Sequence, residues 1–119
     1  MTRNGNKITG NWGEETAAGY LQLEKQFRIL KRNLRLGRSE VDILAMDADV
    51  LVFVEVKVRK NNLFGHPEAS SGKQKARSMH RAAGLYLEQS GFNGPIRFDV
   101  VAITGTPVFY ELLHLEDFI

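Results

Sequence analysis

A glutamate and a lysine inside an otherwise apolar segment are the first side chains of this sequence that indicate chemistry. Residues 50–58 read Val-Leu-Val-Phe-Val-Glu-Val-Lys-Val, a run typical of a buried central strand. The two-residue period of a strand places Glu55 and Lys57 on one face. Burying such charges costs free energy unless they are paired, hydrogen-bonded or bound to a metal. A plain ion pair between Glu55 and Lys57 is the structural alternative.

A second carboxylate, Asp42, lies in the preceding strand-like segment 41–46. A short polar connection predicts that the two segments form a hairpin. If paired residues have numbers that sum to 97, Asp42 lies opposite Glu55 and residues 48–49 form the tip. Directly opposed residues have Cβ atoms about 4.5–5.5 Å apart. A slip of one residue would pair Asp42 with Val54 and separate the two carboxylates onto opposite faces.

The predicted pair of carboxylates suits a divalent metal. Two carboxylates this close repel each other unless a cation lies between them. Hard oxygen ligands in a partly open site favour Mg²⁺ or Mn²⁺, and the backbone carbonyl of Val56 could add a third oxygen. Lys57 would then orient a water or stabilise the charge that develops on a scissile phosphate. The pattern therefore predicts metal-dependent hydrolysis of phosphodiesters, with Asp42, Glu55 and Lys57 as its residues.

The elements that must position these residues follow the order α-β-β-β-α-β-β. Residues 1–9 read as a flexible tail and 10–119 as a single domain. The first helix spans 11–25 with Asn11 as its cap, and the second begins with a capping box at Ser71 and stops at Gly91. Strands are expected at 27–33, 41–46, 50–58, 97–103 and 108–113. This order predicts an α/β fold with a mixed central sheet flanked by helices.

Basic residues cluster in two blocks of the sequence. Residues 25–38 hold six bases and no acid, and residues 57–81 hold seven bases and one acid, although the net charge is only +2. Such blocks around a carboxylate cluster could bind a polyanion. Solvated faces on a mildly basic domain are an equally open interpretation. The candidate nucleic-acid contacts are Lys73, Lys75, Arg77, Arg59 and Arg38.

Composition excludes several other classes of protein. The chain has 119 residues, 43% of them hydrophobic and 25% charged, which suits one globular domain. The lack of cysteine excludes disulfides, thiolate zinc sites and a cysteine nucleophile. No apolar run approaches the roughly 18–20 residues of a membrane span, and the polar start lacks a signal-peptide core. We expect a soluble, cytoplasmic protein.

Several short motifs extend over most of the chain, about residues 10–103. They are Gly13-Glu14-x-x-Ala17, Glu40-Val-Asp42-Ile-Leu, Val52-Phe-Val-Glu55-Val-Lys57-Val-Arg59, Phe64-Gly65-x-Pro67, Lys75, Ala82-Ala83-x-x-Tyr86-Leu87 and Arg97-Phe-Asp99-Val-Val-Ala-Ile103. Together they resemble the bacterial YraN-type family, which is grouped with archaeal Holliday-junction resolvases in the restriction-endonuclease-like superfamily. The resemblance implies that Asp42 and Glu55 are metal ligands, that Lys57 is the catalytic lysine and that Glu14 is a further acidic residue near the metal. Ser39 departs from the glycine that the family usually has there.

The leading hypothesis is a Mg²⁺- or Mn²⁺-dependent endonuclease that acts on DNA, with branched or structured DNA implied by the resemblance. A homodimer would fit the two cuts that a four-way junction needs. The alternative is a non-catalytic nucleic-acid-binding or partner-docking module on the same fold. Among the other polar and aromatic residues, Trp12 and Tyr20 are expected in helix packing, His66 and His80 at the surface and Asp99 in an ion pair with Arg97. The role of Glu40 stays open.

Overall fold

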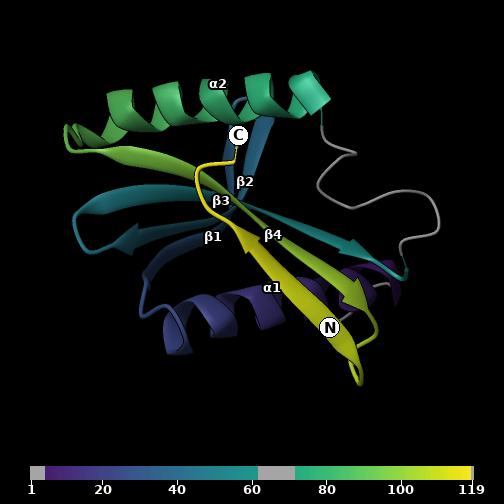
Figure 1. Cartoon of the computed structure of the whole chain (residues 1–119). Coiled ribbons are helices and arrows are strands. Elements are labelled where there is room, and N and C mark those ends of the chain that lie inside the picture. Colours follow the sequence, from purple (N-terminus) through teal and green to yellow (C-terminus); the bar gives the residue numbers. More distant parts are fainter. Residues whose placement is uncertain (1–4, 62–71, 119) are drawn as a thin grey trace.

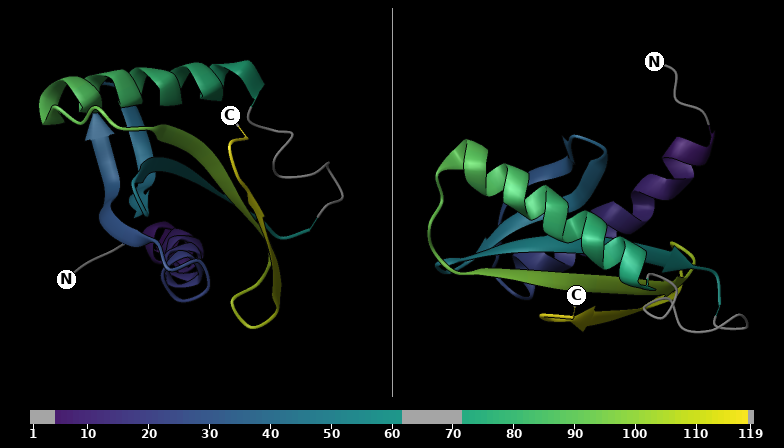
Figure 2. Two further views of the ribbon diagram at one scale, coloured as in Figure 1. Left: turned by 60° about the vertical axis from the view of Figure 1, so that its left-hand side comes forward. Right: turned by 90° about the horizontal axis from the view of Figure 1, so that it is seen from above.

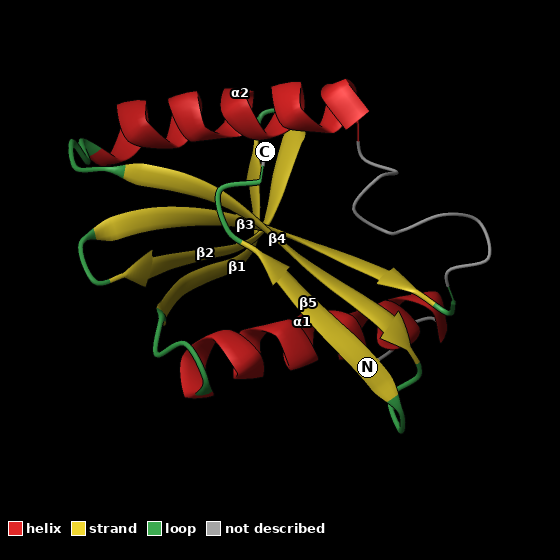
Figure 3. Cartoon of the chain, in the orientation of Figure 1, coloured by secondary structure: helices red, strands yellow, loops and turns green. Residues whose placement is uncertain are grey.

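A computed structural model of the chain describes residues 5–61 and 72–118. It has the α-β-β-β-α-β-β order expected from the sequence, with one five-stranded mixed sheet between two helices (Figure 1). The loops that join the strands are short (Figure 3). In chain order the elements are α1 (Gly5–Leu23), β1 (Arg28–Leu36), β2 (Ser39–Asp47), β3 (Val50–Arg59), α2 (Gly72–Ser90), β4 (Ile96–Gly105) and β5 (Tyr110–Leu115).

The strands lie in the order in which they occur in the chain. β1, β2 and β3 form an antiparallel meander, α2 then carries the chain across the sheet, and β4 pairs parallel to β3. β5 returns antiparallel along β4. β3 therefore has a strand on each side and a helix over each face. This position explains its apolar sequence, because a central strand covered on both faces has little contact with water.

The two helices cover opposite faces of the sheet (Figure 2). On the α1 face, Ala17 and Leu21 pack against Val52 and Val54 of β3. On the α2 face, Met79 and Ala82 pack with Leu51 and Phe53, which alternate with the first pair along β3. Trp12 and Tyr20 are partly buried against the α1-side core, as expected. By the same alternation, Glu55 and Lys57 of β3 belong to the α2 face.

β2 separates from β3 before either strand ends. The β2–β3 pairs run from Asp47↔Val50 to Ile43↔Val54 and stop there. β2 continues to pair with β1 as far as Ser39, and this end of the hairpin turns toward α2. Ser39 is buried there, and its Oγ accepts a hydrogen bond from Ser78 Oγ at 3.2 Å. Ser39 thus joins the hairpin to α2.

The first helix begins earlier than the sequence pattern predicted. α1 starts at Gly5, so Asn11 lies inside the helix and does not cap it, and residues 5–9 are not a tail. The prediction was wrong because residues 5–10 carry no apolar stripe. Extending an existing helix by one turn nevertheless costs little. The predicted stop at Gly91 is confirmed by its φ of +74°, whereas Ser71 and His66 lie outside the described residues.

Close packing holds α1 against the end of β3. A Cβ atom at Gly13 would overlap Cγ2 of Val58, so only glycine allows the helix to approach the strand this closely. Glu14 follows directly in the chain and is therefore carried on the part of α1 nearest to the end of β3. The spacing of helix and strand at Gly13 sets the position of Glu14.

A buried carboxylate, Asp99, organises the other end of the sheet. Its side chain is fully buried and accepts hydrogen bonds from Arg97 Nε at 2.9 Å and from the amide of Asp117 at 3.0 Å. His114 Nε2 lies 2.8 Å from Asp99 Oδ2, and Tyr20 Oη lies 3.1 Å from His114 Nδ1. Burial raises the pKa of Asp99, but the bonds from His114, Arg97 and Asp117 outweigh it and hold the pKa below its usual value. The expected Asp99–Arg97 ion pair is confirmed, and the network joins α1 to β4 and β5.

We expect Asp99→Asn to destabilise the fold by about 3 kcal/mol near neutral pH, because it leaves the buried partners without their anion. The lowered pKa of Asp99 means that its contribution is present above the unfolded pKa, near 4, and fades as pH falls through the folded value. Urea denaturation at pH 7 and at acidic pH measures both effects. Glu111→Gln on exposed β5 is the matched control. An equal stability of Asp99→Asn and wild type at pH 7 would contradict the structural role.

Candidate metal centre

The β2–β3 register agrees with the one that the sequence required. Ile43 pairs with Val54 and Asp47 with Val50, so the paired numbers sum to 97 throughout. The same register brings Asp42 to the level of Glu55, immediately past the last pair, where β2 separates from β3. The two carboxylates therefore meet at a split between strands, a place where side chains can reach backbone groups that no neighbouring strand satisfies.

Asp42 occupies this split. Its Oδ2 accepts a hydrogen bond from the backbone amide of Val56 at 2.8 Å, which takes the place of a bond from β2. The sequence interpretation assigned the carbonyl of Val56 to the metal, and the contact in the structure is made by the amide of the same residue. Burial raises the pKa of Asp42 to about 7, with the negative charges of Glu55 and Glu14 adding to the rise. The Val56 amide and Lys75 oppose that rise only in part.

Glu55 is the second carboxylate of the site and is nearly inaccessible to water, at 7% exposure. Its Oε1 lies 3.0 Å from Nζ of Lys75 on α2. The contact is an ion pair between opposite charges, and Oε1 has no hydrogen-bond partner among the residues described. A buried carboxylate oxygen without a directed donor is costly in a protein interior.

Lys57 lies beside the carboxylates on the same face of β3. Burial lowers the pKa of Lys57, and the positive charges of Arg59 and Lys75 add to this effect. The negative charges of Glu55 and Asp42 act in the opposite direction. Lys57 is thus within electrostatic reach of both proposed metal ligands, as the catalytic assignment requires. Lys75 is a second cation at Glu55, which the sequence interpretation did not pair with it.

Glu14 adds a third carboxylate from the opposite helix. Its negative charge raises the pKa of Asp42, so it lies within electrostatic reach of the split. Glu14 Oε1 is buried and has no hydrogen-bond partner in the described part of the chain. Nη2 of Arg32 on β1 lies 3.7 Å from it, and Nη1 of Arg32 bonds Glu15 at 3.1 Å. This role of Arg32 could not be predicted from the sequence, because β1 and α1 meet only in the tertiary structure.

The chemistry of this donor set fits a small hard cation. Two buried oxygens, on Glu14 and on Glu55, lack hydrogen-bond partners in the described chain, and burial together with the charges of Glu55 and Glu14 raises the pKa of Asp42. Within residues 5–61 and 72–118, no three acidic or histidine side chains converge closely enough to hold an ion by themselves. Mg²⁺ needs no such cage, because it usually keeps several waters and binds one or two carboxylates. Asp42 and Glu55 are the pair that fits this role.

The basic residues predicted to contact nucleic acid differ in their exposure and in their partners. Arg38 is exposed at the β1–β2 turn, Arg77 is exposed on α2, and Arg59 is half-buried at the end of β3. Lys75 points to Glu55 rather than to open solvent. The side chain of Lys73 is not among those described. In the first basic block, Lys25 pairs with Glu116 and Arg32 with Glu14 and Glu15. Glu40 lies opposite Arg35 across the β1–β2 pair.

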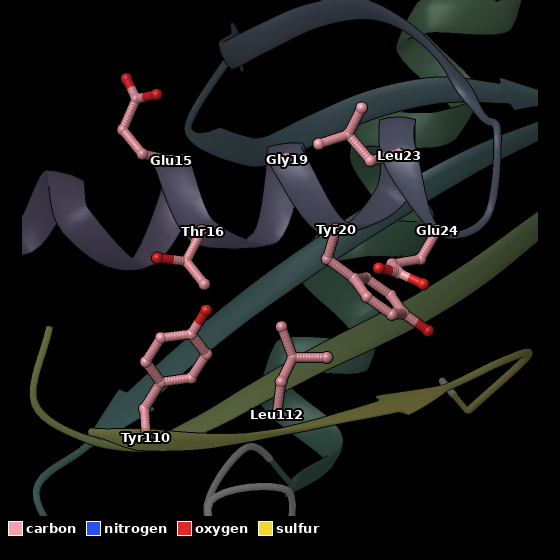
Figure 4. A pocket seen from close by; sticks show the side chains of 8 residues that line it. All are labelled: Glu15, Thr16, Gly19, Tyr20, Leu23, Glu24, Tyr110 and Leu112. Atoms are coloured by element: carbon pink, nitrogen blue, oxygen red, sulfur yellow. The ribbon is translucent and has the colours of Figure 1, made fainter. Parts of the chain in front are cut away.

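A separate pocket of about 540 Å³ lies between α1 and β5 (Figure 4). Tyr20 and Glu24 of α1 face Tyr110 and Leu112 of β5 across it. None of the residues at the β2–β3 split lines this pocket. The candidate metal centre is therefore a polar site where two strands separate, and the pocket belongs to the packing of α1 on the edge strand.

The strand order, the two covering helices and the acidic pair on neighbouring strands define a restriction-endonuclease-like α/β domain. Residues 13–103 match the uncharacterised protein family UPF0102. The chain belongs to this family, which is the YraN family of the sequence comparison above. The match extends from Gly13 on α1 to Ile103 on β4 and so includes every element that contributes to the site.

Several bacterial members of the family align with most of the chain. The UPF0102 protein of Cytophaga hutchinsonii is 39% identical, over 87% of this chain and 90% of the relative. That of Phocaeicola vulgatus is 36% identical over 91% and 88%. That of Anaeromyxobacter dehalogenans is 46% identical over 84% and 75%. Neither helix of the described residues is long and apolar enough to cross a membrane.

Proposed function

We propose that this protein is a metal-dependent nuclease that hydrolyses phosphodiester bonds of DNA, with branched or otherwise structured DNA as its substrate. One observation carries the proposal. Asp42 and Glu55 meet at the split between β2 and β3, beside Lys57, and Oε1 of Glu55 has no hydrogen-bond partner among the described residues. An ion pair between Glu55 and Lys57 alone would not require a second carboxylate, Asp42, whose pKa burial raises to about 7.

Asp42 and Glu55 would hold the cation, with the carbonyl of Val56 and water molecules as further oxygen donors. Bound there, a divalent cation would supply an activated water and neutralise charge on the phosphate. The amide of Val56 holds Asp42 in place through a 2.8 Å bond, so one oxygen of this carboxylate is already oriented. The ligands would thus be positioned by strands rather than by a mobile loop, which favours accurate geometry.

Lys57 supplies the positive charge that the reaction needs. Attack of a water oxygen on phosphorus breaks one phosphorus–oxygen ester bond and leaves a phosphate monoester and a hydroxyl group. Negative charge grows on the phosphate oxygens during this step. An ammonium group held in a partly dry site stabilises that charge more strongly than it would in water. Burial, which lowers the pKa of Lys57, shows that its surroundings are of this kind.

The proposal is tested by incubating the purified protein with fluorescent linear, forked and four-way DNA and with RNA of matched length. Each substrate is assayed with Mg²⁺, with Mn²⁺ and with EDTA. We expect cleavage of the forked or four-way DNA with either metal and none with EDTA. Failure to cut any substrate would contradict the nuclease. Salt-dependent binding without cleavage would instead support the non-catalytic nucleic-acid-binding module, because phosphate contacts weaken steeply with salt.

A further inference from the structure

Lys75 is placed on α2 so that it reaches into the site from above the sheet. It lies in the first turn of α2, four residues before Met79 and seven before Ala82. These spacings put all three on one helix face. Met79 and Ala82 are buried against Leu51 and Phe53 of β3. Lys75 is therefore on the side of α2 that covers the sheet, near the N-terminus of the helix. There it lies over Glu55, the first charged residue after the apolar part of β3.

Two properties of the contact between Lys75 and Glu55 would allow the lysine to leave the carboxylate. Nζ lies 3.0 Å from Oε1, yet Oε1 receives no directed hydrogen bond from the described residues. The side chain of Lys75 is also 32% exposed, whereas that of Glu55 is 9% exposed. A long side chain with this exposure can turn to solvent without moving the helix. Glu55, in contrast, is fixed on a central strand.

The same carboxylate cannot hold Lys75 and a metal equally well. A divalent cation at Glu55 would lie a few ångströms from the ammonium group, and at that distance like charges repel strongly in a partly dry site. We propose that Lys75 stands in for the metal at Glu55 and is released toward the phosphates of the substrate when the metal binds. This inference rests on the proposed function, because it assumes that Glu55 binds the metal.

Release of Lys75 would couple metal binding to nucleic-acid binding. Without metal, Glu55 neutralises the positive charge of Lys75, so Lys75 does not contribute to the binding of DNA phosphates. With metal, the ammonium group is available to a phosphate, as is the guanidinium of Arg77, which is exposed elsewhere on the same helix. Coupling of this kind is reciprocal, so DNA must also tighten the binding of metal. Lys75 then acts as a positioning and regulatory residue, distinct from the catalytic Lys57.

The test uses Lys75→Met, which removes the competing charge and keeps most of the apolar stem. Arg77→Met is the matched control on the same helix. Titration calorimetry with Mn²⁺ and no DNA is expected to show at least threefold tighter binding for Lys75→Met than for wild type, and no change for Arg77→Met. Equal or weaker Mn²⁺ binding by Lys75→Met would overturn the inference and leave the nuclease proposal standing. Absence of Mn²⁺ binding in wild type would overturn both.

A second readout measures the coupling itself. Anisotropy of a labelled four-way DNA junction, verified intact by gel, is recorded with Mn²⁺ and with EDTA. Mn²⁺ is expected to tighten binding of wild type and of Arg77→Met by a larger factor than binding of Lys75→Met. An equal factor in all three proteins would overturn the release of Lys75.

Loss of Lys75 leaves Glu55 buried without its cation, so Lys75→Met is expected to have a lower Tm in the absence of metal. For this reason the stabilisation by Mn²⁺ is also followed as a shift in Tm, which remains measurable in a weakened protein. The shift should be larger for Lys75→Met than for wild type. Lys75→Arg keeps the charge and should bind Mn²⁺ no more tightly than wild type. Tighter binding by Lys75→Arg would contradict competition by charge.

Discussion

Asp42→Asn is expected to abolish cleavage while making the metal-free protein more stable. The amide keeps the size of the carboxylate and one acceptor for the Val56 amide, but it removes the charge that the cation needs. The loss of activity should be roughly 10³-fold or more, since metal-assisted hydrolysis depends on charge stabilisation worth several kcal/mol. Calorimetry with Mn²⁺ should show greatly weakened binding in parallel.

The gain in stability should depend on pH in a defined direction. The pKa of Asp42 is raised from 3.8 to about 7, so the folded protein holds a proton that the unfolded chain releases at lower pH. Wild type therefore loses stability as pH rises from about 4 to about 7, and Asp42→Asn does not. The difference should grow across that window to at most about 4 kcal/mol, at about 1.4 kcal/mol for each unit of pKa shift.

Urea denaturation of both proteins at several pH values, in EDTA, measures this difference. Asp49→Asn, in the exposed hairpin tip, is the matched control and should follow wild type. A variant Asp42→Asn that binds Mn²⁺ like wild type would remove Asp42 from the metal centre. If Asp42→Asn and wild type differed in stability by the same amount at pH 4 and at pH 8, the pKa of Asp42 would not be raised in the folded protein.

Lys57→Ala should separate catalysis from metal binding. We expect cleavage to fall by roughly 10²–10³-fold, the usual effect of removing one group that stabilises transition-state charge. Mn²⁺ binding should be retained or tighter, because one positive charge near Asp42 and Glu55 is gone. Lys75 remains at Glu55, so the fold should tolerate the change. Nuclease assays and calorimetry on the same protein preparation give both results.

The structural ion-pair alternative predicts a different outcome for Lys57→Ala. If the main role of Lys57 were to neutralise Glu55, its removal would destabilise the protein by about 3–5 kcal/mol, as for other broken buried pairs. Thermal denaturation of Lys57→Ala beside Lys60→Ala, which alters an exposed lysine just after β3, distinguishes the two cases. Unfolding of Lys57→Ala together with an unchanged metal response of Asp42→Asn would reject the catalytic assignment.

The sequence was most informative where local periodicity and pairing decide the structure. The alternation in β3 predicted the face of Glu55 and Lys57, and the metal-site hypothesis required the register, with paired numbers that sum to 97, that the structure has. Both follow from the two-residue period of a strand. The separation of β2 from β3 could not be predicted in this way, because it depends on the packing of the β1–β2 hairpin against α2 rather than on either strand alone.

Contacts between elements far apart in the chain account for the rest of what was missed. Lys75 was expected to contact nucleic acid, and its pairing with Glu55 depends on the position of α2 over β3. No role was predicted for His114, although its Nε2 lies 2.8 Å from Oδ2 of Asp99 across the β4–β5 pair. A single sequence contains no signal for either contact, since both arise from how the layers are stacked.

Because Gly13 has no side chain, the position of Glu14 relative to the sheet depends on how closely α1 packs on β3. Because α1 rests directly on Val58, the width of one methyl group decides how far the helix stands from the sheet. Glu14 moves with that helix, while Asp42 and Glu55 are fixed to strands. The strength with which Glu14 acts on Asp42 is therefore set by a residue that carries no charge and makes no polar contact. In this protein the smallest residue acts as a spacer between α1 and β3, and it thereby influences the electrostatic field at the candidate metal centre.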